Sequence, residues 1–203
     1  KLTSITIPDG VTSIEDSTFS NCNELTSITI PDVVTRIGDS AFYNCNALTS
    51  IIIPDSVTYI GSFAFKGCSQ LIQIINGVQY VDNWVIGCDN SVTSITLRES
   101  IRGISHAAFW YCSELTSITI PDSVKYICNQ AFYECIKLTS IYIPDSIISI
   151  KNYAFDVCRE LTNIIYGGTK EQWKNISKDT YWNRNTGEYT VHCTDGDIAK
   201  ANS

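Results

Sequence analysis

The chain has 203 residues, of which 44% are hydrophobic and 17% are charged, a composition too apolar for a disordered protein. Its 21 acidic and 14 basic residues give a net charge of −7, which repels nucleic acid phosphates and anionic lipid surfaces. No apolar run approaches the roughly 18 residues that span a bilayer, so we expect neither nucleic acid binding nor direct membrane insertion. Because Lys1 and Leu2 already lie inside a repeat, we expect a piece of a longer protein, whose lack of a secretion signal carries no weight.

One sequence recurs along the chain about every 23 residues. It reads LTSITIPDGVTSIEDSTFSNC in its first copy and LTSITIPDVVTRIGDSAFYNC in its second. Eight copies begin at Leu2, Leu25, Leu48, Leu71, Val92, Leu115, Leu138 and Leu161. A period of 20–29 residues with an LxxIxI core is typical of leucine-rich repeats. The pattern therefore predicts an α/β solenoid, mainly β, built as a right-handed stack of leucine-rich repeats of about 23 residues.

Each repeat predicts the same order of short elements. In LTSITI, the leucine and isoleucines alternate with serine and threonine, which indicates a short strand. The proline that follows ends this strand, because proline cannot donate to a sheet ladder. Val11 and Ile14 form a second inward-facing pair, which favours a brief strand on the opposite side. Ala41 and Phe42 predict a return through a turn of α- or 3₁₀-helix.

Stacking converts each apolar position of the repeat into a column that is buried by the copies on either side. The phenylalanine column contains Phe19, Phe42, Phe65, Phe109, Phe132 and Phe155, with Trp84 or Val85 in the missing place. We expect Phe132→Ala to cost about 3–5 kcal/mol, since a buried ring and its packing are both lost.

The fourth repeat departs from the pattern and carries Asn76-Gly77 in place of Pro-Asp. Asn-Gly is a strong tight-turn signal, so residues 71–91 are interpreted as an altered repeat that contains a hairpin. A linker between two short solenoids is the alternative, against which the apolar segment YVDNWVI argues. The solenoid is expected to cover residues 1–166.

Beyond the last repeat the sequence predicts a C-terminal cap over residues 167–194. Gly167 and Gly168 break the pattern, and TKEQ is a capping box that opens a short helix through Trp173 and Ile176. Residues 189–193 favour a final strand, and residues 195–203 are expected to form a frayed tail.

The unit LxxIxIPxxVxxIGxxAFxxCxxL closely resembles the BspA-like class of bacterial leucine-rich repeats, from Leu2 to about Tyr166. The segments YVDNWVIGCDNSVTSITL and IIYGGTKEQWKNI are also similar to elements of this family in gut-associated Gram-positive bacteria. The resemblance implies a secreted or surface-attached protein that takes part in adhesion and recognition.

Nine cysteines are the first candidates for chemistry. Seven of them share one repeat position: Cys22, Cys45, Cys68, Cys88, Cys112, Cys135 and Cys158. We interpret them as buried free thiols that act as small apolar residues. Neighbouring copies would lie close enough for a disulfide by their Cα atoms, but parallel side chains hold the Cβ atoms too far apart. No CxxC pair supports zinc.

No group of residues predicts an enzyme. His192 and Cys193 are neighbours, but adjacent strand residues face opposite sides, so the imidazole cannot activate the thiol. His106 takes the place of Asp39 of the second repeat, a surface position. The column of Asp9, Asp32, Asp55, Asp122 and Asp145 could attract calcium, although one carboxylate per repeat is a thin ligand set. We expect no cofactor, metal site or catalytic residue.

The exposed surface is the remaining candidate. The outward strand column reads Thr6, Thr29, Ile52, Ile75, Thr96, Thr119, Tyr142 and Ile165. A second exposed row carries Tyr59, Tyr80 and Tyr126, and the turns add Tyr43, Trp110, Tyr111 and Tyr133. From these we predict a partner-binding surface of Ile52, Ile75, Tyr142, Tyr59, Tyr126 and Trp110, since exposed aromatic and aliphatic side chains favour contact. For any one of these residues, good strand formation explains the choice equally well.

Two functions follow. The first is a non-catalytic module, extracellular or on the cell surface, that binds a protein or glycan of a host or neighbouring cell. The alternative is a passive spacer that displays another domain of a longer surface protein.

Overall fold

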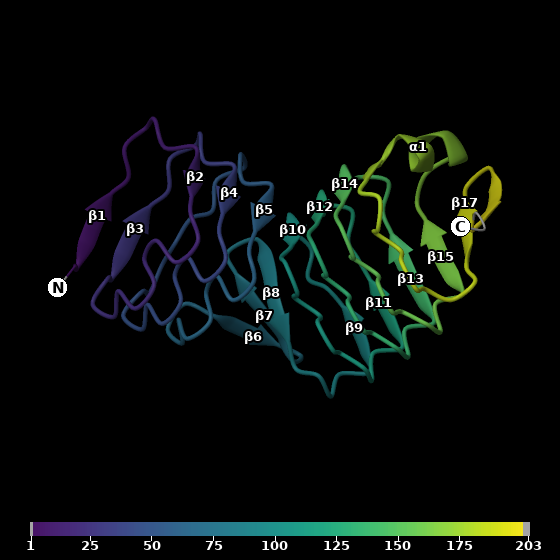
Figure 1. Cartoon of the computed structure of the whole chain (residues 1–203), viewed down its shortest axis with the longest axis horizontal. Coiled ribbons are helices and arrows are strands. Elements are labelled where there is room, and N and C mark those ends of the chain that lie inside the picture. The colour runs from purple at the N-terminus through teal and green to yellow at the C-terminus, as the bar shows by residue number, and fades with distance from the viewer. Residues whose placement is uncertain (1, 201–203) are drawn as a thin grey trace. The chain divides into compact units, whose positions relative to one another are not determined.

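The computed structural model describes residues 2–200, which form two compact units, unit 1 up to Ile86 and unit 2 from Gly87 onwards. Both units consist of short strands joined by turns that recur with about 23-residue spacing (Figure 1). The predicted leucine-rich repeat solenoid, mainly β, is confirmed.

In unit 1 the strands form two parallel rows and one hairpin. The strands are β1 (Ser4–Thr6), β2 (Ser13–Ile14), β3 (Ser27–Thr29), β4 (Arg36–Ile37), β5 (Tyr59–Ile60), β6 (Gln73–Ile75), β7 (Val78–Val81) and β8 (Trp84–Cys88), which ends just beyond the unit. β1 pairs with β3, and a bridge between Ser27 and Ser50 continues this row. β2, β4 and β5 form the second row. The predicted second strand of each repeat is therefore present.

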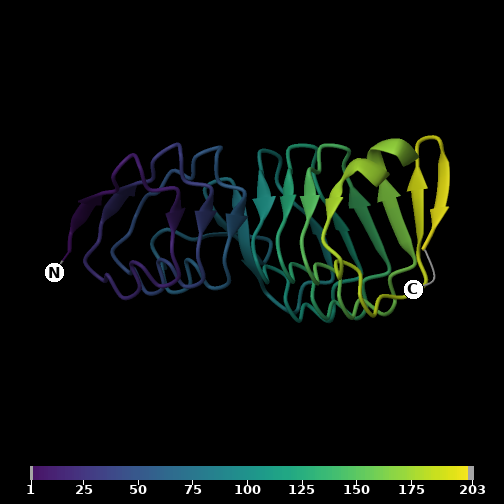
Figure 2. The ribbon, with the colours of Figure 1, turned by 45° about the horizontal axis from the view of Figure 1, so that its top comes forward.

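Unit 2 repeats this arrangement and ends in a cap. Its elements are β9 (Ser94–Thr96), β10 (Gly103–Ile104), β11 (Ser117–Thr119), β12 (Tyr126–Ile127), β13 (Ser140–Ile143), β14 (Ser149–Ile150), β15 (Asn163–Tyr166), α1 (Lys170–Asn175), β16 (Ser177–Lys178), β17 (Thr190–Cys193) and β18 (Gly196–Ala199). First strands β9, β11, β13, β15 and β17 lie side by side, as do second strands β10, β12, β14 and β16 (Figure 2). All these neighbours are parallel.

The core of each unit is a set of stacked columns. Phe42 lies 5.3 Å from both Phe19 and Phe65 between ring centroids, and Phe132 lies 5.0 Å from both Phe109 and Phe155. Every one of these rings is at most 7% exposed. The predicted phenylalanine column is confirmed within each unit, and in the altered repeat both Trp84 and Val85 are fully buried.

The predicted helical return after the second strand is wrong, because the AF segments are successive tight turns with two left-handed residues in each of six repeats. One left-handed column comprises Ser17, Ser40, Phe63, Ala107, Gln130 and Tyr153, and the other Asn21, Asn44, Gly67, Tyr111, Glu134 and Val157. Amides between them donate to the next repeat, as Phe42 N does to Ala64 O and Phe132 N to Ala154 O, both at 2.8 Å. A helix would use these groups internally and leave the stack unpaired.

Polar side chains reinforce the stacking. In five repeats, the hydroxyl of the threonine that follows the first leucine donates to the carbonyl of its counterpart one repeat earlier, as Thr26 does to Thr3 at 3.2 Å. The Asp16 carboxylate accepts from Asp39 N at 2.8 Å, and Asp39 in turn accepts from Ser62 N. A Cβ atom at Gly38 would lie 2.4 Å from Asp16 Oδ1 and 2.6 Å from Asp16 N, which explains the glycine between these ladders.

The altered repeat and the cap largely follow the sequence. β6 and β7 form the predicted antiparallel hairpin around Asn76 and Gly77. The predicted capping box is also confirmed, with Thr169 and Gln172 exchanging hydrogen bonds at the start of α1. The frayed tail is wrong for residues 196–199, which form β18 antiparallel to β17. Residues 201–203 of that prediction lie outside the described residues.

Candidate functional site

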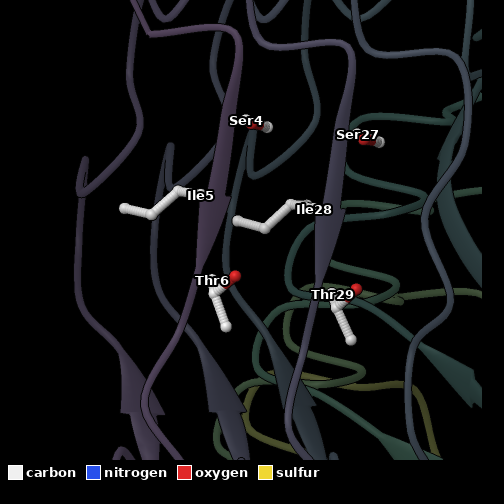
Figure 3. Close-up of a pocket in the computed structure, with 6 residues that line it drawn as sticks. All are labelled: Ser4, Ile5, Thr6, Ser27, Ile28 and Thr29. Carbon is white, nitrogen blue, oxygen red and sulfur yellow. The ribbon is translucent and has the colours of Figure 1, made fainter.

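The first-strand row of unit 1 presents one face to solvent. Strand alternation turns Ile5 and Ile28 away from the side on which the serines and threonines lie (Figure 3). The register pairs Ser4 with Ser27 and Thr6 with Thr29, and the bridge from Ser27 to Ser50 brings Ile52 next in line. We call Ser4, Thr6, Ser27, Thr29, Ser50 and Ile52 the unit-1 strand face.

This face is hollowed. One hollow of about 330 Å³ is lined by Ser4, Ile5, Thr6, Ser27, Ile28 and Thr29 (Figure 3). A second, of about 370 Å³, shares its β3 residues and continues to Ile52 and Pro54. A third, of about 340 Å³, lies at the end of the strand between Thr29, Asp9 and Asp32. The hollows adjoin through Thr29, so hydroxyl groups line a surface that has carboxylates at one edge only.

Ile52 is the most exposed large apolar side chain of the described residues, at 79%. Ile75 is 43% exposed but does not continue the same row, because β6 pairs antiparallel with β7. The predicted exposure of Ile75 is therefore confirmed, but the strand partner of β6 is the hairpin strand β7 and not a neighbouring first strand.

In unit 2 the pairing aligns Thr96, Thr119, Tyr142, Ile165 and His192 in one row. Tyr142 is only partly exposed. Its hydroxyl fills the space above Gly167, where a Cβ would lie 2.7 Å away. Burial, and after it the carboxylates of Asp122 and Asp145, raise the pKa of Tyr142. This ring thus packs between two repeats and is a weaker contact residue than its column predicts.

The predicted tyrosine row is partly corrected. Tyr59 lies under the guanidinium of Arg36, at 4.6 Å from its ring centroid, and Tyr126 lies under Arg102 at 5.6 Å. Both tyrosines are partly exposed. Tyr80 is 1% exposed and belongs to the core of the hairpin, so its place in an exposed row is wrong.

Trp110 is exposed, as predicted, and does not stand alone. Its ring lies 4.5 Å from that of Tyr111, which lies 6.1 Å from that of Tyr133. The adjacent Glu134 hydrogen-bonds to both tyrosines. The sequence indicated the three aromatic residues separately and missed Glu134.

The two histidines are held in structural contacts, and the thiol of Cys193 is half-buried. His192 uses both ring nitrogens, at 3.0 Å from Asp197 Oδ1 and 3.1 Å from Asn163 Oδ1. His106 contacts Gln130 at 3.0 Å. Burial raises the pKa of Cys193, which is the opposite of what a thiolate nucleophile requires.

The cysteines that recur at one position of the repeat form hydrogen bonds between repeats. The thiols of Cys45, Cys68, Cys135 and Cys158 donate to the carbonyl of the phenylalanine one repeat earlier, at 3.0–3.1 Å. A neighbouring thiol and burial raise the pKa of Cys68, Cys112 and Cys135 well above its usual value. All nine cysteines are free in the structure. These thiols bridge repeats as hydrogen-bond donors.

The aspartates after the prolines are spread one per repeat. In residues 2–200, no three His, Cys, Asp or Glu side chains come together as a metal site would require. The same residues contain no helix long and apolar enough to cross a membrane.

The geometry defines a class of protein: a leucine-rich repeat solenoid whose candidate site is an open strand face. The profile of the BspA type leucine-rich repeat region matches residues 1–112 and 86–200 with six copies. The chain belongs to this family. Leucine-rich repeat families of this kind are generally non-enzymatic binding scaffolds.

Among solved structures, the chain is similar to a leucine-rich repeat protein of T. pallidum, at 24% identity over 80% of this chain and 68% of that one, with a TM-score of 0.39. A leucine-rich cell surface protein of Faecalibacterium prausnitzii shares 29% identity over 89% of this chain and 64% of that one, with a TM-score of 0.38. A leucine-rich repeat protein of Eubacterium ventriosum shares 26% identity over 98% of this chain and 48% of that one, with a TM-score of 0.42. The chain thus spans 48–68% of these relatives. No curated protein matches it.

Proposed function

We propose that the chain is a non-catalytic recognition module of a secreted or cell-surface bacterial protein, and that it binds a protein partner through the unit-1 strand face. The main supporting observation is the 79% exposed Ile52 beside hollows lined by serine, threonine and isoleucine residues. Covering such an apolar side chain with a partner removes it from water, which lowers the free energy of the complex.

The composition of the face suits protein contact. Serine and threonine hydroxyls offer hydrogen bonds without the desolvation cost of a charge, and the centres of protein interfaces are depleted in charged residues. The carboxylates of Asp9 and Asp32 lie at the edge, where charges steer association. The family and its binding-scaffold character support the proposal, and the surface location rests on the family resemblance.

The test is Ile52→Asp in the full chain, measured by biolayer interferometry against a panel of immobilised host extracellular-matrix proteins. We expect binding to weaken at least about tenfold, because a buried unpaired carboxylate replaces the apolar contact. The matched control is Ile165→Asp, which places the same charge at a 44% exposed isoleucine in the first-strand row of unit 2. Equal loss in both variants, or in neither, contradicts the proposed face.

A spacer is the second candidate, and one observation favours it. The outward residues of β1 and β3 are only serine and threonine, a face with no large anchor of its own. If the module is a spacer, the panel shows no binding that depends on Ile52, and the flanking segments of the longer protein carry the recognition.

A further inference from the structure

A second surface lies on two adjacent AF turns of unit 2. Trp110 and Tyr111 belong to one turn, and Tyr133 and Glu134 occupy the equivalent positions of the next. We call these four residues the aromatic patch. Trp110 and Tyr111 are 43% and 42% exposed, and Tyr111 N donates to Tyr133 O at 3.0 Å, which fixes the two turns against each other.

The patch combines ring surfaces with one acceptor. Trp110 meets Tyr111 edge to face at 4.5 Å, and Tyr111 meets Tyr133 at 6.1 Å with an angle of 62°. The hydrogen bond with Glu134 raises the pKa of Tyr111, and burial together with Glu134 raises that of Tyr133. The Glu134 carboxylate therefore lies near both phenol groups.

The backbone conformation at Tyr111 and Glu134 indicates that these two residues are not there to stabilise the fold. Tyr111 and Glu134 have φ angles of 59° and 58°, and the same column in unit 1 carries Asn21, Asn44 and Gly67. Asparagine and glycine adopt this left-handed conformation at lower cost than other residues, by about 1 kcal/mol or more. A tyrosine that is exposed and conformationally costly needs another reason to be there, and ligand contact is one.

The arrangement discriminates between kinds of ligand. A cage for a quaternary ammonium ion needs rings set around a space, whereas Trp110 and Tyr111 touch at 4.5 Å. Glu134 would lose its solvation beneath an apolar protein partner, and it repels a phosphate or sulfate group. A neutral polyhydroxylated ring satisfies both halves of the patch, because its C–H face covers an aromatic ring while its hydroxyls donate to the carboxylate.

We propose that the aromatic patch is a binding site for a neutral carbohydrate. Trp110 and Tyr111 provide the stacking surface, and Glu134 accepts hydrogen bonds from the sugar hydroxyls. The site lies in unit 2, on turns and not on strands, so it is separate from the protein-binding face proposed for unit 1, and either proposal can fail alone.

The test titrates the full chain with neutral oligosaccharides, namely cellotetraose, maltotetraose, mannotetraose and N-acetylchitotetraose. Tryptophan fluorescence reports on the patch, since Trp84, Trp173 and Trp182 are at most 9% exposed. We expect a saturable change with at least one of the four sugars. Tyr111→Asn should abolish it, and Glu134→Gln should weaken binding at least about tenfold, as expected for the loss of charged acceptor bonds.

Tyr111→Asn also separates binding from folding. It installs the residue that unit 1 carries at Asn44, so it should melt at the same temperature as the parent chain or higher while losing the sugar. Ile52→Asp is the matched control and should bind sugar like the parent chain. The proposal is overturned if none of the four sugars binds at millimolar concentration, if Tyr111→Asn binds normally, or if tetramethylammonium binds the patch in their place.

Discussion

At the scale of single residues, a phenylalanine inside the column is buried by the rings one repeat before and one repeat after it. Phe132 lies between Phe109 and Phe155 with interplanar angles of 2° and 6°, and none of the three rings is exposed. A cavity at this position cannot close without shifting two neighbouring repeats, so the loss of packing should be felt in full.

We therefore predict that Phe132→Ala lowers the free energy of unfolding by about 3–5 kcal/mol. Chemical denaturation followed by circular dichroism measures it. Phe63→Ala is the matched control, because Phe63 is 50% exposed and lies outside the column, and its loss should cost little. Equal costs for the two variants would show that the column is not the core.

Val157 is a second residue with a clear energetic consequence. Its φ angle is 64°, in the left-handed region, where a β-branched side chain is a genuine outlier. We predict that Val157→Asn raises the free energy of unfolding by about 1 kcal/mol, because asparagine tolerates this conformation. The reverse exchange, Asn44→Val, should destabilise by at least as much, since Asn44 also donates to Asn21 at 3.2 Å. Chemical denaturation measures both variants, and destabilisation by Val157→Asn would contradict this.

The sequence predicts residues of this kind only in part. The columns of phenylalanine and cysteine could be found, because the same residue type recurs every 23 positions. The left-handed columns could not, because Asn21, Asn44 and Gly67 suggest them but Tyr111, Glu134 and Val157 hide them. The stack imposes this conformation on residues whose own preference is against it.

At the scale of elements, the cap closes unit 2 with polar contacts as well as packing. Asp156 is completely buried and accepts from Arg184 at 2.8 Å and from Asn185 at 3.0 Å. β18 adds an antiparallel strand after β17, which no repeat follows within the described residues. The short polar segment GDIA gave no apolar alternation, so the sequence indicated a tail where cross-strand hydrogen bonds make a strand.

Lys178 gives the cap a pH dependence. Its amino group donates to the carbonyls of Trp173 and Ile176, and burial lowers its pKa from 10.5 to about 8. Between these two pH values the unfolded chain binds a proton that the folded chain has released, so the contribution of this group to stability rises with pH. Below about pH 8 both states are charged, and the folded protein bears the cost of burying the charge.

We predict that the difference in unfolding free energy between the parent chain and Lys178→Met shifts in favour of the parent chain as the pH rises through 8 to 9.5. The comparison is needed because thiols such as Cys68, whose pKa is raised in the folded chain, work in the opposite direction in both proteins. Thermal melts of the two proteins at matched pH values measure the difference. A difference that stays constant would mean that the Lys178 amino group titrates normally.

At the scale of the whole molecule, the architecture could be predicted from the sequence because the same preferences for strands and turns recur in most copies of the repeat. The predicted partner-binding surface was only partly correct. Ile52, Ile75 and Trp110 are exposed, but β6, which carries Ile75, pairs with the hairpin strand β7, and Tyr142 packs over Gly167. The exposure of a residue depends on which side chains the neighbouring repeats place beside it. The spacing of residues along the chain does not give this information.

Each repeat is held by the backbone and rings of the next, and native-state amide hydrogen exchange measures this stacking. The amides of Phe42, Phe109 and Phe132 each donate across repeats at 2.8 Å. We predict that they are among the slowest to exchange in their units, although they lie in turns. Exchange at the rate of an unstructured peptide would contradict the account.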